Sequence, residues 1–295
     1  MTDVTPALLD GEDLLTPETS EVHSPYDGAL VGTVPACSTD DLDRAVAVAL
    51  ERHHAGPPPA HERAAILDRA AALLLDRLDE FAESIAREAA KPITTARVEA
   101  ERAADTIRFS AAIARTLTGE MVAMDASSAG VGKLGYVMRV PVGVVAAISP
   151  FNFPLNLVCH KIAPAVAAGC PVVLKPASAT PLTALKIARL FEEAGLPPGW
   201  LNVITCGGAV ANHLVEHPDV AMITFTGSPE VGWGIRARAA RKRVGLELGN
   251  NAPVILESSA DLAAAAAKIA VGGYAFAGQS CISVQRAYVH RSIHD

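Results

Sequence analysis

The sequence predicts an α/β fold in which a doubly wound parallel sheet carries helices on both faces. Hydrophobic residues make up 50% of the 295 residues and aromatic residues only 4%. Ala and Val are abundant, as expected where Ala-rich helices pack on buried Val-rich strands. From residue 144 onward, short apolar runs alternate with helix-length segments, and a polar turn follows each run. This alternation is the strongest of the three observations.

Five apolar runs predict the strands of this sheet. They are residues 144–148, 171–174, 201–204, 220–225 and 244–248. The segments after the first four predict helices at about 154–168, at 181–194, up to about 215, and at 229–240. Strands joined in this way run parallel, because each crossover returns the chain to the same edge of the sheet. The arrangement is Rossmann-like, and such sheets bind nucleotides at the carboxyl ends of their strands.

Helices precede this sheet, and a second α/β unit follows it. Three helices are expected at about 38–54, 62–90 and 94–117, the first capped by Ser38, Thr39 or Asp40. Residues 132–140 read as an extended segment. After the sheet, a strand at 253–256, a helix at 261–276 and a strand at 286–290 look like the start of a second lobe.

Charge, hydropathy and cysteine content exclude several classes of function. The net charge of −7 argues against a nucleic-acid-binding protein. No uninterrupted apolar run reaches the roughly 18 residues of a membrane span, and the acidic N-terminus is not a signal peptide. The 5 cysteines show no CxxC pair and no metal-ligand spacing. We therefore expect no metal site, no disulfide framework and a reducing, cytoplasmic setting.

Two polar residues follow the first two predicted strands. Asn152 lies in Pro150-Phe-Asn-Phe-Pro154, where its amide can donate to a developing oxyanion. Taken alone, Asn152 is more simply explained as a helix cap. Lys175 ends the second strand and can reach a ribose or a phosphate, although an ordinary exposed Lys is the simpler explanation there too.

Two further strand ends carry polar residues. Ser228 opens a helix after Thr224-Phe-Thr-Gly227, where backbone amides suit a pyrophosphate and where a simple helix cap is an equal alternative. The generic GxGxxG pattern is absent. Glu247 sits in a hydrophobic strand, so it is either a desolvated general base or the partner of Lys242 or Arg243.

Cys281 follows a glycine-containing turn, Gly278-Gln-Ser-Cys281. We expect this turn to enter a helix, whose amides would give the thiol thiolate character. The alternative is a buried small apolar residue, which is the interpretation we adopt for Cys159, Cys170 and Cys206.

Five motifs, in the same order, resemble the aldehyde dehydrogenase family from about residue 15 to the end. They are Pro150-Phe-Asn-Phe-Pro154, Leu174-Lys-Pro-Ala177, Phe225-Thr-Gly-Ser228 with Gly232, Leu246-Glu-Leu-Gly249 and Gly278-Gln-Ser-Cys281. One such motif could arise by chance, but not all of them in order. The resemblance implies an enzyme that oxidises a small aldehyde to a carboxylic acid with NAD or NADP, and a homo-oligomer for the full-length family.

The resemblance also implies the role of each site residue. Cys281 would be the nucleophile, Asn152 would hold the oxyanion together with the Cys281 amide, and Glu247 would activate water. Lys175 would bind the adenosine ribose or its 2′-phosphate, and Ser228 the pyrophosphate. The remaining cofactor-binding residues would be Pro150, Phe151, Ser178, Gly227 and Gly232.

Three departures from the family pattern matter. Ser178 stands where many NAD-preferring relatives have Glu, so repulsion of a 2′-phosphate is removed and the hydroxyl can donate to it. NADP is therefore expected to be accepted, and its preference over NAD stays open. Asn250 replaces a second Gly, in a turn where Asn tolerates positive φ. Phe276 stands where Asn is frequent, and the run 277–286 is similar to members that act on small hydroxy-, phospho- or phosphonoaldehydes.

The resemblance divides the chain into four parts. They are an N-terminal helical part of the cofactor-binding domain (1–129), an extended oligomerisation-type segment (130–143), a Rossmann-like NAD(P)-binding core (144–249) and an incomplete catalytic domain (250–295). Family members continue well beyond Asp295, so the chain is expected to be C-terminally truncated and the strand at 286–290 to lack neighbours. The alternative function is a non-catalytic nucleotide-binding remnant. Glu247 argues against a CoA-acylating relative, because a hydrolytic base would waste the thioester.

Overall fold

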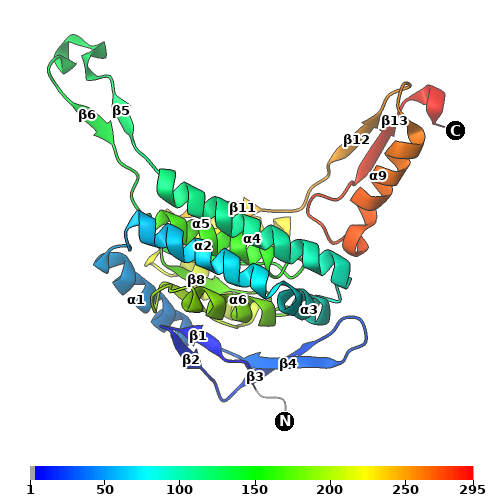
Figure 1. Cartoon of the computed structure of the whole chain (residues 1–295), viewed down its shortest axis with the longest axis horizontal. Helices are drawn as coiled ribbons and strands as arrows, with labels where there is room; N and C mark the ends of the chain where they lie inside the picture. The colour runs from blue at the N-terminus through cyan, green and yellow to red at the C-terminus, as the bar shows by residue number, and fades with distance from the viewer. Residues whose placement is uncertain (1–3, 295) are drawn as a thin grey trace.

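The centre of the molecule is a seven-stranded sheet in the order β11-β10-β7-β8-β9-β1-β2 (Figure 1). The computed structural model describes residues 4–294. Five neighbouring strands are parallel: β7 (Val144–Ile148), β8 (Val172–Lys175), β9 (Leu201–Val203), β10 (Val220–Thr226) and β11 (Arg243–Glu247). The predicted doubly wound α/β fold is confirmed, and each predicted strand of the sheet is found within about one residue of its expected bounds.

The apolar side chains of these strands alternate between two cores. Val145 and Ala147 face the core that includes α5 (Asn156–Ala168) and α6 (Leu182–Glu193). Val144, Ala146 and Ile148 face the opposite core. That core is formed by α1 (Thr39–Ala55), α7 (Gly208–Glu216) and α8 (Pro229–Arg238). Every side chain of β7 is buried, as the two-residue period of a strand covered on both faces requires.

A further layer of helices covers α5 and α6. It comprises α2 (Ala60–Asp76), α3 (Leu78–Ala89) and α4 (Ile93–Thr116). The expectation of a single helix over residues 62–90 was wrong. The helix is interrupted at Arg77, whose φ of −113° and ψ of 27° lie outside the helical range. Helix α1 begins where expected, since Ser38 and Asp41 form a reciprocal capping box.

The N-terminal segment contains strands that the sequence prediction missed. Strand β1 (Ala7–Leu9) pairs antiparallel with β9, and β2 (Glu12–Leu14) pairs antiparallel with β1 at the edge of the main sheet. Strands β3 (Thr19–His23) and β4 (Leu30–Pro35) form a separate antiparallel pair. Asp10 and Gly11 join β1 to β2 with positive φ angles of 53° and 81°. Asp-Gly is a strong hairpin signal, so this turn could have been recognised from the sequence.

Two units project from the body of the molecule (Figure 1). The first is the antiparallel pair of β5 (Glu120–Val122) and β6 (Gly135–Val137), so the segment expected to be simply extended is half of a hairpin. The second contains β12 (Pro253–Leu256), α9 (Leu262–Tyr274) and β13 (Arg286–Val289). The expectation that the last strand lacks neighbours was wrong, because β13 pairs in parallel with β12.

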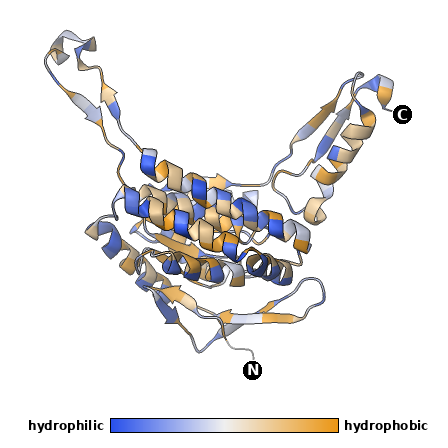
Figure 2. Ribbon diagram, in the orientation of Figure 1, coloured by the Kyte–Doolittle hydropathy of each residue, from blue (hydrophilic) through white to orange (hydrophobic). Residues whose placement is uncertain are grey.

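Both projecting units contain hydrophobic residues (Figure 2). In the hairpin, Met121, Leu134 and Tyr136 are exposed, and α9 has no buried residue. Among the helices of residues 4–294, none is both long enough and apolar enough to cross a membrane.

Candidate active site

A cleft of about 560 Å³ lies at the carboxyl ends of β7, β8, β10 and β11. This volume is within the range of small-molecule sites, roughly 300–1,000 Å³. The four strands are adjacent in the sheet, so the polar segments that follow them converge. The cleft is lined by these predicted site residues: Pro150, Phe151, Asn152, Lys175, Ser178, Gly227, Ser228, Glu247 and Cys281. Gly232 is not part of the lining, and a Cβ there would lie 2.4 Å from the Leu248 side chain.

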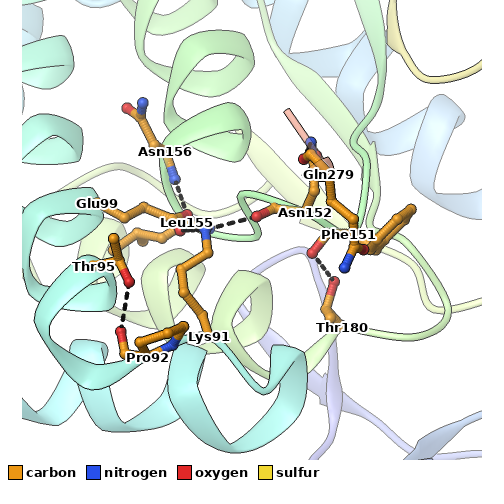
Figure 3. Close-up of polar contacts among 10 residues, drawn as sticks. All are labelled: Lys91, Pro92, Thr95, Glu99, Phe151, Asn152, Leu155, Asn156, Thr180 and Gln279. Atoms are coloured by element: carbon orange, nitrogen blue, oxygen red, sulfur yellow. Dashed lines mark hydrogen bonds and ion pairs between the residues drawn. The ribbon is translucent and has the colours of Figure 1, made fainter. Parts of the chain in front are cut away.

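Asn152 is held from both sides by contacts that reach other parts of the chain (Figure 3). Its side-chain Nδ2 donates to the carbonyl of Gln279 at 2.7 Å, and its own carbonyl accepts from Lys91 Nζ at 2.7 Å. Its Oδ1 is buried and has no hydrogen-bond partner among the described residues. A buried amide oxygen without a partner is uncommon in folded proteins, and here it lies beside an open cleft. One Nδ2 hydrogen stays free to donate to a bound carbonyl oxygen.

Lys91 and Glu99 form a buried ion pair that the sequence prediction missed. The two side chains are 2% and 1% exposed, and Nζ lies 2.5 Å from Oε2. Glu99 Oε1 accepts the backbone amides of Leu155 at 3.0 Å and Asn156 at 3.1 Å, at the start of α5 (Figure 3). Burial lowers the pKa of Lys91, while the adjacent Glu99 carboxylate raises it. Lys91 lies between two expected helices and Glu99 lies within the second of them, and neither position signalled in the sequence that the charge would be buried.

Lys175 and Ser178 line the cleft at the end of β8. Lys175 is 7% exposed, and its burial lowers its pKa. The Ser178 hydroxyl donates to the carbonyl of Cys206 at 3.2 Å. Ser has one hydroxyl hydrogen, so donation to a 2′-phosphate would require this bond to break. Whether or not the hydrogen bond to Cys206 breaks, Ser178 carries no carboxylate that would repel a 2′-phosphate.

Ser228 caps α8 by accepting the amide of Val231 at 3.4 Å, so the capping role considered from the sequence is present. The same residue lines the cleft, where the first turn of α8 presents its amino end. A Cβ at Gly227 would lie 2.4 Å from the ring of Phe225, so glycine there allows the turn to pack on that ring. Ser228 therefore both caps the helix and borders the cleft.

Glu247, the last residue of β11, lies beside Thr226 of β10 and is exposed. Among the described residues it forms no ion pair with Lys242 or Arg243, and its exposure does not fit a desolvated carboxylate. Glu247 interacts electrostatically with two residues of α5, Lys161 and His160. Lys161 Nζ donates to Thr226 Oγ1 at 2.8 Å, and burial lowers its pKa to about 8, with Glu247 opposing the shift. Lys161 lies in a helix that is rich in apolar residues, and this was the sequence signal that could have revealed its burial.

Cys281 is the half-buried cysteine of this chain, and the other four are buried. The expectation that its turn enters a helix was wrong, because α9 ends at Tyr274 and Cys281 lies in a turn that leads toward β13. Asn250 Nδ2 donates to the carbonyl of Cys281. Asn250 is not among the residues with positive φ, so it acts here through its side chain.

The doubly wound sheet thus has a cleft at the carboxyl ends of its strands, lined by a half-buried cysteine and by a candidate oxyanion donor. The chain belongs to the aldehyde dehydrogenase family, whose sequence profile matches residues 15–295. This membership was predicted from the order of the motifs in the sequence, and the comparison confirms it.

Three relatives illustrate the similarity. The chain is 47% identical to the 3-sulfolactaldehyde dehydrogenase of Priestia megaterium over 287 residues, which cover 97% of this chain and 60% of the relative. It resembles the crystal structure of an NAD-dependent aldehyde dehydrogenase from Sinorhizobium meliloti with a TM-score of 0.94 and 41% identity, covering 100% of this chain and 60% of the other.

The third relative is the NADP-dependent glyceraldehyde-3-phosphate dehydrogenase from Bacillus halodurans C-125 complexed with NADP. It matches with a TM-score of 0.94 and 38% identity, covering 98% of this chain and 62% of the other. The relatives thus include NAD-dependent and NADP-dependent enzymes, and this chain spans about 60% of their length.

Proposed function

We propose that this chain oxidises a small aldehyde to a carboxylic acid with NADP or NAD, using Cys281 as the nucleophile. The observation that carries the proposal is the convergence of Asn152, Lys175, Glu247 and Cys281 on one cleft of about 560 Å³. In this proposal, residues 144–249 form the cofactor-binding core, with 1–129 as its helical part and 130–143 as an oligomerisation segment. Residues 250–295 belong to the catalytic domain.

The proposed reaction assigns a separate task to each residue. The Cys281 thiolate adds to the aldehyde carbon, and the free Nδ2 hydrogen of Asn152 stabilises the oxyanion of the thiohemiacetal. A nicotinamide cofactor held in this cleft would supply the acceptor for the hydride of this carbon. Glu247, exposed at the end of β11, then takes a proton from the water that hydrolyses the thioester.

The chain's own residues fit a dinucleotide in this cleft. Lys175 lies where it can meet the adenosine ribose or its 2′-phosphate, and Ser228 where the amino end of α8 can meet the pyrophosphate. Ser178 removes the carboxylate that would repel a 2′-phosphate. We expect Ser178→Glu to weaken NADP binding by about tenfold or more, because the new carboxylate would repel the 2′-phosphate. A tenfold change corresponds to about 1.4 kcal/mol. NAD lacks this phosphate, so its binding should stay within about threefold. Calorimetric titration measures both, and a strong preference of the wild type for NAD over NADP would refute the expectation that NADP is accepted.

The proposed substrate is a small hydroxyaldehyde that carries an anionic group. Sulfolactaldehyde and glyceraldehyde-3-phosphate, the substrates in the names of two relatives, both have this form. NADPH formation followed by absorbance tests the reaction with each of them and with an uncharged aldehyde. Cys281→Ala should abolish turnover, while Cys159→Ala, at a fully buried cysteine, should leave the mechanism intact.

A non-catalytic nucleotide-binding remnant is the second candidate. One observation favours it: most of the cleft lining comes from residues 148–249, so nucleotide binding draws little on the C-terminal unit. NADP binding without turnover of any of these aldehydes would select this alternative. The free cysteines support a cytoplasmic setting. The exposed apolar hairpin supports a homo-oligomer, which sedimentation measures directly.

A further inference from the structure

Phe276 has an unusual backbone conformation close to the cysteine. Its φ and ψ are both 49°, and Ala277 follows with a φ of 54° and a ψ of 31°. Residues with a Cβ rarely adopt this left-handed region, so surrounding contacts must hold the backbone there. Phe276 is also one of the departures from the family pattern. The contacts of its ring therefore need a physical explanation.

The ring of Phe276 packs against the ammonium group of Lys91. Lys91 Nζ lies 4.4 Å from the centroid of this ring and 3.8 Å from the centroid of the Phe153 ring. The two rings meet edge to face, with centroids 6.4 Å apart and planes inclined by 64°. The ammonium group is thus attracted to two aromatic rings from different parts of the chain. Phe153 follows Asn152, and Phe276 precedes Cys281 by five positions.

The same ammonium group is fixed in place by two hydrogen bonds. It donates to Glu99 Oε2 at 2.5 Å and to the carbonyl of Asn152 at 2.7 Å (Figure 3). Because Glu99 also binds the first amides of α5, Lys91 is anchored to the helix that follows Asn152. The Lys91 side chain is thereby held in one orientation, because both of its hydrogen-bond acceptors are themselves fixed.

We propose that Lys91 is a positioning residue that joins the Asn152 loop to the Cys281 loop, with Phe276 as its contact on the cysteine side. The inference rests on the proposed function, in which Asn152 and Cys281 act on one carbonyl group. The hydrogen bond from Asn152 Nδ2 to the Gln279 carbonyl, at 2.7 Å, links the same two loops a second time. An apolar residue at position 91 could pack on the rings but could not bind the Asn152 carbonyl.

Hydrogen exchange on the full chain tests the link without requiring activity. Lys91→Met should raise exchange by about tenfold or more in residues 149–157 and also in 275–281, because opening of either loop then no longer has to break the shared contact. Phe276→Leu should produce the same pattern in weaker form. The matched control is Lys186→Met, since Lys186 Nζ pairs with Glu80 at 3.0 Å and lies 5.7 Å from the Phe81 ring, away from the cleft.

The control should change neither loop. The proposal is overturned if Lys91→Met loosens residues 149–157 alone, or if Phe276→Leu leaves residues 149–157 unchanged. Should Lys91→Met fail to fold because Glu99 is left buried and unpaired, the Phe276→Leu result decides by itself. Phe276→Tyr keeps the ring and should restore the wild-type exchange.

Turnover separates positioning from a general structural role. Lys91→Met should lower kcat by about tenfold or more, since displacement of a reacting group by about 1 Å can reduce a rate about a hundredfold. The Kd for NADP should change by less than kcat, because Lys91 itself does not line the cleft and most of the cofactor-binding residues lie outside residues 149–157. Lys91→Arg, which keeps the charge, should recover most of kcat. A loss of NADP affinity as large as the loss of kcat would overturn the proposal. If the wild type shows no turnover, the proposed function fails, while the exchange experiment still decides whether Lys91 joins the loops.

Discussion

Two buried glutamates serve the amino ends of two neighbouring helices in this protein. Glu88 accepts the amides of Leu182 at 2.9 Å and Thr183 at 3.0 Å, at the start of α6. Glu99 binds the corresponding amides at the start of α5. Neither helix has a side-chain cap of its own, so a distant carboxyl group takes that role. Helix α6 follows the Lys175 segment of the cleft, and α5 follows Asn152.

The two glutamates differ in how their charge is balanced. Glu99 is paired with Lys91, whereas Glu88 forms no ion pair within residues 4–294. Burial raises the pKa of Glu88 to about 7, and repulsion from Glu99 adds a little to this change. The carboxyl group on the cofactor side is therefore partly protonated near neutrality. On the reacting side, Glu99 instead lies against Lys91, a cation that also orients Asn152. Both glutamates cap a helix, but among the described residues only Glu99 is paired with a lysine. That lysine, Lys91, has a second contact, with the carbonyl of Asn152.

The largest expected effect comes from removing Glu99. Glu99→Ala leaves the Lys91 ammonium buried without its carboxylate and two amides without an acceptor, so it should lower the free energy of unfolding by about 3–5 kcal/mol. Glu88→Ala leaves two amides unpaired but no buried charge, and should cost about 1–3 kcal/mol. Urea denaturation of both variants at pH 7 measures the difference. Equal losses would show that Lys91 does not distinguish the two sites.

The second effect is a pH dependence that belongs to Glu88. Its folded-state pKa is raised from 4.5 to about 7, so its contribution to stability is fully present below pH 4.5 and is lost as the pH rises through 7. Each tenfold change in proton affinity corresponds to about 1.4 kcal/mol, so the loss is on the order of 3 kcal/mol. Glu88→Gln should remove this slope from the free energy of unfolding between pH 4.5 and 7. Glu83→Gln, at an exposed position on the same helix, should keep it. A wild-type slope that survives in Glu88→Gln would assign it to another group.

The alternation of apolar runs and helices predicted the parallel sheet because each of those strands is buried on both faces. Strand β7 shows this directly, since all five of its residues are buried. The N-terminal strands were missed because each is only three to six residues long, too short for a clear alternating pattern, although the Asp10-Gly11 turn was a usable signal. The pairings of β1 with β9 and of β13 with β12 were missed for a different reason, as no local pattern specifies a partner more than 30 positions away.

The candidate site was predictable where a residue follows a strand. Asn152, Lys175 and Glu247 line the cleft because the carboxyl ends of parallel strands meet at one edge, and their roles there stay a prediction. Lys91 and Glu99 were not predictable, since they come from the helical layer and reach the site through tertiary packing. The sequence pattern thus identified residues that line the cleft. The structure was needed to find Lys91 and Glu99, which orient Asn152 and the start of α5.

The smallest expected effect concerns an ion pair of the same helical layer that is not buried. Arg115 Nη2 lies 2.5 Å from Asp68 Oδ2 and joins α4 to α2, but both side chains are 47% exposed. Water already solvates these charges, so Arg115→Ala should lower the free energy of unfolding by at most about 1 kcal/mol. Salt screens exposed charges, and the difference from wild type should disappear at about 1 M NaCl, where the Debye length is about 3 Å. The deficit of Glu99→Ala should persist at that salt concentration, because Lys91 is shielded from ions by its burial. A salt-insensitive loss in Arg115→Ala would mean that exposure does not separate the two kinds of pair. Helices α2 and α4 would then depend on this contact as well as on their buried alanines.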